Sequence, residues 1–543
     1  MIGRWAPLYL LAAAAIGGGV SHLWSGRDVR VPWIILALVA FGAWAGASLA
    51  WSPDPAHGFG GLIQFTVYVA LIWGVTGIDR QALLEWMPWL AALAVLGMIG
   101  FGIYDPTFEF GGLGNRNFFV EALSLLAVFM FAAKDEPAAL LVGGGYVILA
   151  ALWLIFAQES NLGFVAFGGI GVVGFVALCR RRPFWGAVLF LVLSNLAVWA
   201  PWTERATSAM AARVELGINT AILWWDHLWI GGGFGSFNAL YGAYREGHLK
   251  YLPDWGTIFI PVNQFPGQAH NELLQVGAET GVVGIVLALL VMAALARGML
   301  KPRDRLDVVA TCVLAIGAGF CLVEFPLRNP STGATLAVAA GIVCQGRSLR
   351  LQASPWFRCL ATAGGYVFVP TLLVCGMIWI KAWLIFTGTI AWQHLYPKQA
   401  FIWNYQAIQL WPYDRRFRHQ FMLTLRFLMY KAGDKVKLTT KAADIAYDIS
   451  RSAAPHEPSI QIARVEYLLT SRRFKESDEI EKLLRALSRA ARHQPAYWLV
   501  EANYGLAYGD RERVAWAVDN GRRLKATPNQ LATFDKFTDL LEN

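Results

Sequence analysis

Charged residues are scarce in this sequence, at 15% of its 543 positions, whereas a soluble globular chain averages roughly 25%. Hydrophobic residues make up 56% of the chain, and the mean hydropathy is +0.44. Apolar runs such as 31–50, 138–157 and 163–179 recur along the chain, and most of them approach the ~20 residues that cross a bilayer. The scarcity of charge therefore excludes an ordinary soluble protein, and we predict a polytopic membrane protein.

The sequence also lacks the short motifs of metal and nucleotide chemistry. It contains no HExxH motif, no Walker loop and no DxD pair in a loop predicted to face outward. Its serines, histidines and aspartates also occur in no arrangement that indicates a catalytic triad. No CxxC pair is present, and the cysteines lie in or beside apolar segments, as small buried hydrophobic residues do. We therefore expect no metal and no cofactor. The six cysteines are Cys179, Cys312, Cys321, Cys344, Cys359 and Cys375.

The apolar segments predict an all-α membrane domain of about 12 transmembrane helices. Short loops rich in Arg and Lys remain cytoplasmic, and the three clearest, which begin at Arg180, Arg297 and Arg347, agree in parity. The same parity places Met1 outside, although Arg4 favours the inside. The predicted crossings are 5–23, 32–51, 60–78, 87–104, 118–133, 138–157, 162–179, 184–200, 271–297, 307–324, 333–346 and 360–387. The segments predicted to lie outside are 51–59, 105–117, 158–161, 201–269, 324–332 and the C-terminal tail.

A change in composition near residue 390 predicts two domains. Residues 1–390 hold the apolar segments and a long outward loop, 201–269, in which 214–229 is typical of an amphipathic helix and Gly231–Gly235 of a flexible break. Residues 391–543 carry 24 Lys/Arg and 17 Asp/Glu and form a basic, water-soluble tail. Helix pairs in this tail have a spacing similar to tetratricopeptide repeats, although the period is irregular. We expect the tail to bind lipid headgroups, a glycan or a protein partner; an ordinary solvated surface explains its charge as well.

The segment from His270 to Gly281 is the strongest candidate for chemistry. A histidine that faces water at the mouth of a membrane helix can accept a proton near neutral pH, and the helix N-terminus beside it favours anions. On an ideal helix Gly277, Gly281 and Gly284 share the face of His270, so that another helix can approach closely. Glu279 points away, toward a neighbouring helix or a buried cation. The alternative to a catalytic base is a helix-starting histidine that is hydrogen-bonded to a loop.

Arginines in the predicted outer loops are candidates for binding phosphate. A pyrophosphate leaving group needs positive charge because its own charge grows in the transition state, and the arginine fork matches phosphate oxygens better than lysine does. Charge so close to lipid is usually functional or paired, although an arginine at the interface can also extend toward the headgroups. These arginines are Arg116, Arg205, Arg213, Arg245 and Arg328.

Several motifs together resemble the O-antigen ligase and polymerase superfamily of bacterial envelopes. The segment His270–Gly284 is close to the pattern HNxxLxxxxExGxxG of that family. Arg213, followed by Asp226-His227 and Gly231–Phe237, is similar to the pattern R…DHP…GxGxGxF. The segments Gly114–Phe118 and Trp51–Asp54 resemble GNPN and WS-x-D.

The resemblance implies a fold related to the lipid-dependent, GT-C-like glycosyltransferases. It implies metal-independent, inverting transfer of a glycan from undecaprenyl diphosphate to an acceptor hydroxyl, on the periplasmic face of the bacterial inner membrane. By position, His270 would activate the acceptor and Arg213 would hold the donor pyrophosphate. The other residues that the motifs and the outer loops nominate for the site are Arg116, Arg245, Arg328, Asn115, Asn117, Asn271 and Glu279.

Two departures from the family pattern concern phosphate binding. Arg116 stands where the family usually has the proline of GNPN, and Ser160-Asn161 stands where the family often has Ser-Arg. The second phosphate-binding arginine is therefore missing at Asn161, and we hypothesise that Arg116 replaces it.

The resemblance leaves the acceptor open. A ligase transfers the glycan to lipid A-core or to a protein, whereas a polymerase transfers it to another lipid-linked glycan. The basic tail slightly favours a polymerase, or a specialised ligase that docks an envelope protein. A transporter or flippase of lipid-linked sugars is the rival class, but charges inside the predicted membrane segments are scarce. A non-enzymatic scaffold would leave the loop motifs unexplained. Nothing in the sequence indicates nucleic-acid binding.

Overall fold

The structure is a computed structural model that describes most of the chain. Helices dominate the described residues, and β1 (Val29–Pro32) and β2 (Ser348–Leu351) add a short antiparallel ribbon. The prediction of an all-α fold is therefore confirmed, apart from this ribbon. The described residues are 29–104, 204–244, 247, 267–351, 355–432, 440–453, 458–470, 477–490, 495–524, 528–542 and single positions between 121 and 132. The predicted crossings 5–23, 138–157, 162–179 and 184–200, and most of 118–133, lie outside them.

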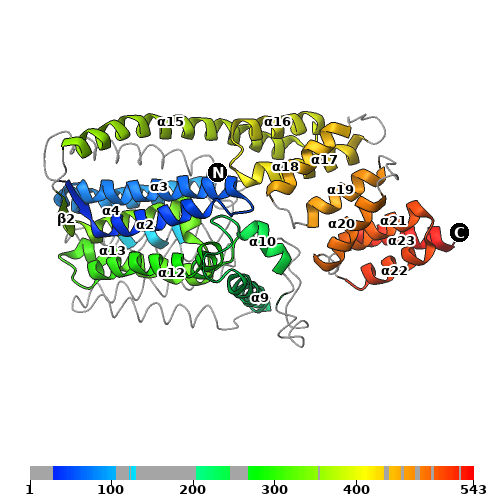
Figure 1. Cartoon of the computed structure of the whole chain (residues 1–543), viewed down its shortest axis with the longest axis horizontal. Helices are drawn as coiled ribbons and strands as arrows, with labels where there is room; N and C mark the ends of the chain where they lie inside the picture. Colours follow the sequence, from blue (N-terminus) through cyan, green and yellow to red (C-terminus); the bar gives the residue numbers. More distant parts are fainter. Residues whose placement is uncertain are drawn as a thin grey trace.

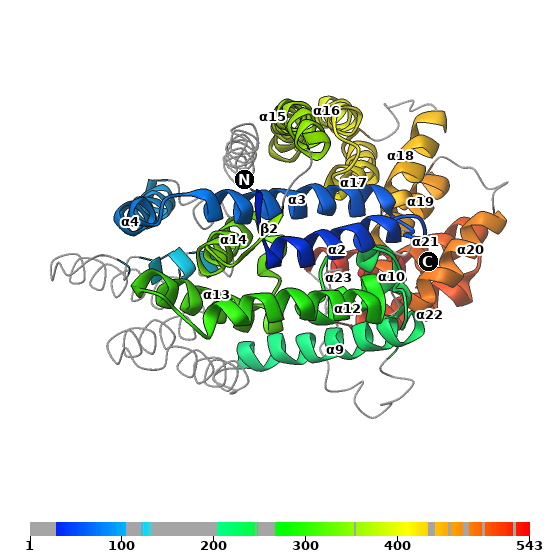
Figure 2. The ribbon, with the colours of Figure 1, turned by 60° about the vertical axis from the view of Figure 1, so that its left-hand side comes forward.

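Apolar helices form a bundle that occupies one half of the molecule (Figures 1 and 2). Within it α3 packs on α14, α2 packs on α12, and α13 packs on α14. Leucine, isoleucine, valine and alanine side chains fill the spaces between these helices. The helices of this half are α2 (Trp33–Ser48), α3 (Pro55–Gly77), α4 (Arg80–Tyr104), α12 (Glu272–Met299), α13 (Arg305–Val323), α14 (Pro330–Cys344) and α15 (Pro355–Trp392).

Four spans in the described helices are long and apolar enough to cross a membrane: Pro55–Gly77, Glu272–Met299, Arg305–Leu322 and Val374–Trp392. Trp33–Ser48 and Ser331–Cys344 are shorter apolar helices. The four long spans overlap the predicted crossings 60–78, 271–297, 307–324 and 360–387, and the chain is a multi-pass membrane protein.

A charged cluster joins the helices at one end of the bundle. The Arg80 guanidinium at the start of α4 lies 2.5 Å from Asp304 and 2.6 Å from Asp307, and it donates to the amide oxygen of Gln345. Asp304 also caps α13 by accepting from the Asp307 N–H. The cluster thereby fixes α4, α13 and the end of α14 relative to one another.

The predicted loop 201–269 is largely helical where the structure describes it. It contains α9 (Glu204–Asp226) and α10 (Phe237–Tyr244). The predicted amphipathic helix 214–229 is therefore wrong in its bounds, because the helix begins ten residues earlier and ends three residues earlier. Packing explains the helix: α9 lies along α12, and the absence of a side chain at Gly277 lets the Trp224 ring approach the backbone of α12.

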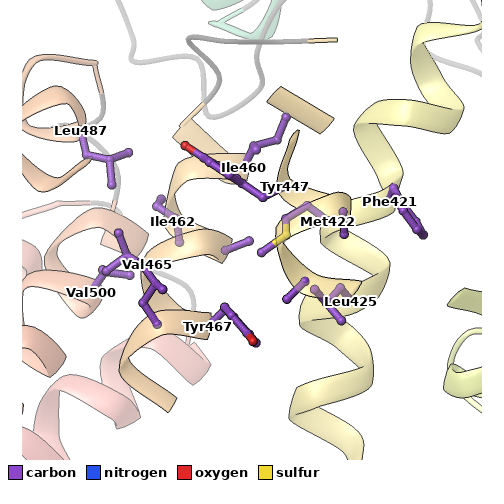
Figure 3. Close-up of a cluster of buried hydrophobic side chains, with 14 of the residues drawn as sticks. Phe421, Met422, Leu425, Tyr447, Ile460, Ile462, Val465, Tyr467, Leu487 and Val500 are labelled. Atoms are coloured by element: carbon purple, nitrogen blue, oxygen red, sulfur yellow. The ribbon is translucent and has the colours of Figure 1, made fainter. Parts of the chain in front are cut away.

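The helices of the predicted C-terminal domain gather at the other end of the molecule from the apolar bundle (Figure 1), and the division into two domains stays a prediction. Figure 3 shows part of their core, where Met422 and Leu425 lie between Phe421 on one side and Ile462 and Val465 on the other. The last turns of α15 join this core, because Trp383 and Phe386 pack on Phe417. The helices of the domain are α16 (Pro397–Leu410), α17 (Arg415–Ala432), α18 (Thr440–Ala453), α19 (Pro458–Thr470), α20 (Ser477–Ala490), α21 (Pro495–Tyr508), α22 (Arg511–Arg522) and α23 (Pro528–Glu542).

The predicted helix–turn–helix pair around Gly509 and Asp510 is confirmed. Gly509 has φ +73, where glycine ends α21 without steric cost, and Asp510 caps α22 by accepting from the Arg513 N–H at 2.9 Å. The similarity to tetratricopeptide repeats stays a prediction.

Helix α12 is broken at Gly281, which corrects the ideal helix expected from the sequence. Gly281 has φ 67 and ψ −168, a conformation that is essentially restricted to glycine. The break exposes backbone groups that the chain between α9 and α10 satisfies: Val282 N–H donates to the Leu228 carbonyl at 2.8 Å, and Gly232 N–H donates to the Ala278 carbonyl at 2.9 Å. Irregular backbone in a membrane segment is tolerated where protein satisfies it in this way.

Replacing Gly281 by alanine is expected to lower the free energy of unfolding by about 1–3 kcal/mol or more. A methyl group there would adopt a strained conformation and overlap the Trp229 carbonyl. Thermal unfolding in detergent measures the effect. The control is Gly77→Ala at the end of α3, where a methyl group has nothing within 4 Å and alanine favours the helix. Equal stability of the two variants would contradict the break.

Candidate active site

The candidate site lies where α12 begins and α13 ends. Asn271 caps α12 by accepting from the Leu274 N–H at 2.9 Å, and its amide nitrogen donates to the Leu322 carbonyl at 3.0 Å. The predicted helix start is therefore confirmed, and Asn271 ties the two helices together. His270 precedes the cap with φ 51, and among the described residues it is the one non-glycine residue with positive φ. Such a conformation costs roughly 1–3 kcal/mol and often marks a functional site.

Glu324 links His270 to Arg213. One carboxylate oxygen lies 2.8 Å from His270 Nδ1, and the other lies 2.5 Å from Arg213 Nη2. Glu324 is the C-cap residue of α13 and is 1% exposed, whereas the side chains of His270 and Arg213 are partly exposed. The Phe325 ring packs edge-on against the imidazole, with centroids 4.9 Å apart. Because the carboxylate holds Nδ1, the other ring nitrogen, Nε2, takes no part in this contact.

The charge state of Glu324 follows from its contacts with His270 and Arg213. Burial alone would raise the pKa of this carboxyl group, but the hydrogen bond from His270 and the positive charge of Arg213 hold the pKa below its ordinary value. Glu324 is therefore a carboxylate at neutral pH, and it can stabilise a proton on His270.

Arg213 has a spare hydrogen-bond donor. Its Nη2 binds Glu324, while its Nε is buried and has no hydrogen-bond partner in the part of the chain that the structure describes. Buried donors are rarely left unpaired, so this one is suited to an anionic ligand.

Arg328 forms a second cluster beside the first. It lies in the short helix η3 (Pro326–Arg328), 3.4 Å from Glu272 and 3.2 Å from Glu279. Burial alone would lower its pKa, but the charges of Glu279 and Glu272 raise the pKa above its ordinary value, so Arg328 is charged. These contacts use Nε and Nη2 of Arg328 and leave Nη1 for another acceptor.

Glu279 was expected to meet a neighbouring helix or a buried cation, and it binds the partly buried guanidinium of Arg328. Its carboxylate accepts from Arg328, from the Gln275 side chain at 2.9 Å and from the Gly235 N–H at 3.1 Å. The segment Gly231–Gly235 is therefore tightly packed, and the prediction of a flexible break is wrong. Its glycines serve close backbone contact, since a methyl group on Gly233 would lie 2.5 Å from the Ser52 Cα atom.

Four of the candidate site residues lie outside the part of the chain that the structure describes. They are Arg116, Arg245, Asn115 and Asn117, so their roles stay predictions. Among the residues that are described, no group of three or more His, Cys, Asp or Glu side chains is arranged to hold a metal ion.

The geometry gathers a histidine, three carboxylates and two arginines at one end of a membrane bundle. Residues 146–289 match the O-antigen ligase family. The chain is related to the O-antigen ligases and polymerases. The exopolysaccharide production protein ExoQ of Rhizobium meliloti (strain 1021) is 26% identical over 355 residues, which cover 60% of this chain and 78% of that protein. The family resemblance carried by the motifs is thereby confirmed.

The O-antigen ligase match contains Arg213 and His270 but ends before Glu324 and Arg328. It indicates an enzyme of membrane glycan transfer, similar to membrane glycosyltransferases.

Three carboxylates near the site were not nominated from the sequence. Glu324 and Glu272 bind the site residues directly, and Glu121 is fully buried, with no hydrogen-bond partner for its carboxyl oxygens among the described residues. Glu324 could have been nominated from the sequence, because it is an acidic residue at the end of the predicted crossing 307–324. Charge at the end of a membrane helix is usually functional or paired.

Proposed function

We propose that this O-antigen ligase relative transfers a glycan from undecaprenyl diphosphate to an acceptor hydroxyl, on the periplasmic face of the bacterial inner membrane. The contact of His270 and Arg213 with one buried carboxylate, Glu324, is the observation that carries the proposal. It combines a base and a phosphate-binding group, which are the two functions that such a transfer needs. The family match supports the substrate class.

His270 is proposed as the general base. Its Nε2 takes the proton of the acceptor hydroxyl as the oxygen attacks the anomeric carbon of the donor sugar. Nδ1–H donates to Glu324, and this carboxylate orients the ring and stabilises the imidazolium. One displacement forms the new glycosidic bond, breaks the bond to the pyrophosphate and inverts the anomeric carbon.

Arginines are proposed to stabilise the pyrophosphate leaving group. Arg213 offers its buried, unpaired Nε, and Arg328 offers Nη1. Their positive charge compensates the negative charge that grows on the leaving oxygen. Arg116 and Arg245 are proposed to assist from their loops, with Arg116 in the place of the arginine missing at Asn161. Asn115, Asn117 and Asn271 are proposed as further site residues because they belong to the family motifs, and Glu279 balances the charge of Arg328.

A polymerase and a ligase of this family differ in the acceptor of the glycan. A polymerase elongates a lipid-linked glycan, whereas a ligase transfers the glycan once to lipid A-core or to a protein. We favour a polysaccharide polymerase, because the relative ExoQ is named for exopolysaccharide production. The C-terminal domain is proposed to be periplasmic, TPR-like and able to bind an envelope protein. A transfer assay with a defined lipid-linked oligosaccharide decides: product ladders indicate a polymerase, single additions indicate a ligase, and lipid movement across the bilayer without transfer would indicate a flippase.

Replacing Arg213 by alanine is expected to lower kcat by about 10²–10³-fold, as loss of a group that stabilises transition-state charge does. Lysine at this position is expected to restore only part of the activity, because it keeps the charge but lacks the fork. The measurement is transfer in proteoliposomes. Arg297→Ala, an exposed arginine in the last turn of α12, is the control. Near-normal turnover of R213A would reject the assignment of Arg213.

A further inference from the structure

The C-terminal domain contacts the membrane domain through a buried ion pair. Nη2 of Arg418 on α17 lies 2.8 and 3.1 Å from the two carboxylate oxygens of Asp54, and the side chains are 8% and 2% exposed. The two residues are 364 positions apart in the sequence. Because charges so deeply buried are costly unless paired, this contact fixes α17 over the start of α3.

Asp54 also organises the turn between α2 and α3. Its Oδ1 accepts from the His57 N–H at 3.1 Å and caps α3. A second contact between the domains lies nearby, where the Phe59 and Tyr413 rings have centroids 5.0 Å apart. The turn 51–59 is therefore held from the side of the C-terminal domain by both charge and packing.

The same turn, together with the end of α2 and the start of α3, also contacts the glycine loop, which we define as Gly231–Gly235. The Trp51 indole N–H donates to the Gly231 carbonyl at 3.1 Å, and the Phe234 N–H donates to Ser48 Oγ at 2.9 Å. A methyl group on Gly235 would lie 2.5 Å from the Gly58 Cα atom. Backbone lies on backbone here, so a displacement of the turn must displace the glycine loop.

The glycine loop in turn holds the carboxylate that binds Arg328. The Gly233 N–H donates to the Glu279 carbonyl at 2.9 Å, and the Gly235 N–H donates to Glu279 Oε2 at 3.1 Å. The same oxygen lies 3.2 Å from Arg328 Nη2. A continuous series of contacts therefore runs from α17 to the site.

We propose that Arg418 is a positioning residue: through Asp54 and the glycine loop, the C-terminal domain sets the place of Glu279 and so of the Arg328 guanidinium. The inference rests on the proposed function only in the part played by Arg328, which is binding of the donor pyrophosphate. The C-terminal domain then completes the site in addition to any partner that it binds.

Hydrogen–deuterium exchange of the purified full-length protein tests the mechanical link without any substrate. In Arg418→Ala, exchange at the amides of Gly233 and Gly235 is expected to rise about tenfold, because the turn that supports their hydrogen bonds loses its anchor. Arg426→Ala is the matched control: Arg426 lies on the same helix α17 and has a two-pronged ion pair with Glu466, but that pair lies within the C-terminal domain. Unchanged exchange in the glycine loop of R418A would overturn the proposal.

A milder variant covers the case in which R418A does not fold. Asp54→Asn removes the charge from the pair, while asparagine can still cap α3. Its glycine loop is also expected to exchange faster than that of the wild type. Unchanged exchange in D54N overturns the proposal in the same way.

Transfer kinetics test the consequence for the site. R418A is expected to raise the KM for the lipid-linked donor about tenfold, because Arg328 is proposed to bind the pyrophosphate in the bound donor as well as in the transition state, and loss of such binding appears in KM. The KM for the acceptor is expected to stay unchanged, and Arg418→Lys is expected to restore most of the donor KM. A merely structural role would reduce the amount of active enzyme and lower the apparent kcat, with both KM values unaltered, and that outcome overturns the proposal. A wild type without transfer would reject the proposed function, while the exchange result would still decide the link.

Discussion

Replacing His270 by alanine is expected to lower kcat of glycan transfer by about 10²–10⁴-fold, the usual contribution of a general base. The backbone at His270 makes a second variant more informative. With φ 51, alanine is strained at this position, whereas asparagine tolerates left-handed backbone better. His270→Asn is therefore expected to fold as well as the wild type and to be as inactive as H270A. Single-turnover transfer from a defined lipid-linked oligosaccharide in proteoliposomes gives the rate.

The control for this experiment is a histidine in the C-terminal domain. His394 is exposed and packs edge-on against Phe427, so His394→Ala is expected to leave transfer within about twofold of the wild type, as ordinary surface substitutions do. Retained turnover in H270N, with normal folding, would contradict the assignment of His270 as the base.

Local signals in the sequence were sufficient for the start of the candidate site. The helix start could be predicted from two local signals, an N-cap residue at Asn271 and the change from a polar loop to an apolar run. The structure begins α12 at Glu272. Glu279 binds Arg328 and not His270, as expected, but the ideal helix behind that expectation does not extend to His270, which has φ 51 and precedes α12. The crossings that coincide with α3, α12 and α13 followed from length and composition alone.

Contacts between distant parts of the chain could not be predicted in the same way. His270 and Glu324 are 54 positions apart, and Asp54 and Arg418 are 364 apart, so no spacing rule joins them. The break at Gly281 was missed because an isolated glycine in an apolar run is compatible with a straight helix. Its conformation depends on the backbone of Trp229, which reaches it only in the folded chain.

Glu324 is the residue on which the candidate site depends most. It is the shared partner of His270 and Arg213, so its loss affects the base and the leaving-group contact together. Removing one partner of a buried charge cluster leaves the others uncompensated. Glutamine keeps the shape of the side chain but carries no charge, and aspartate keeps the charge but is one methylene shorter. The two variants therefore separate the effect of the negative charge from the effect of the side-chain length.

Glu324→Gln is expected to lower kcat by about 10²–10³-fold, because the imidazolium and Arg213 both lose their counter-charge. Glu324→Asp is expected to be impaired as well, since one shorter carboxylate cannot keep both contacts, at 2.8 and 2.5 Å.

The lowered pKa of Glu324 also makes the stability of the folded protein depend on pH. A lowered carboxyl pKa stabilises the folded protein above the ordinary glutamate value, and this contribution is lost as the pH falls through the lowered pKa. The stability difference between wild type and E324Q is therefore expected to be full at pH 7 and to vanish in acid. Thermal unfolding across this range measures it, and a difference that persists in acid would mean that the charge of Glu324 does not hold the cluster together.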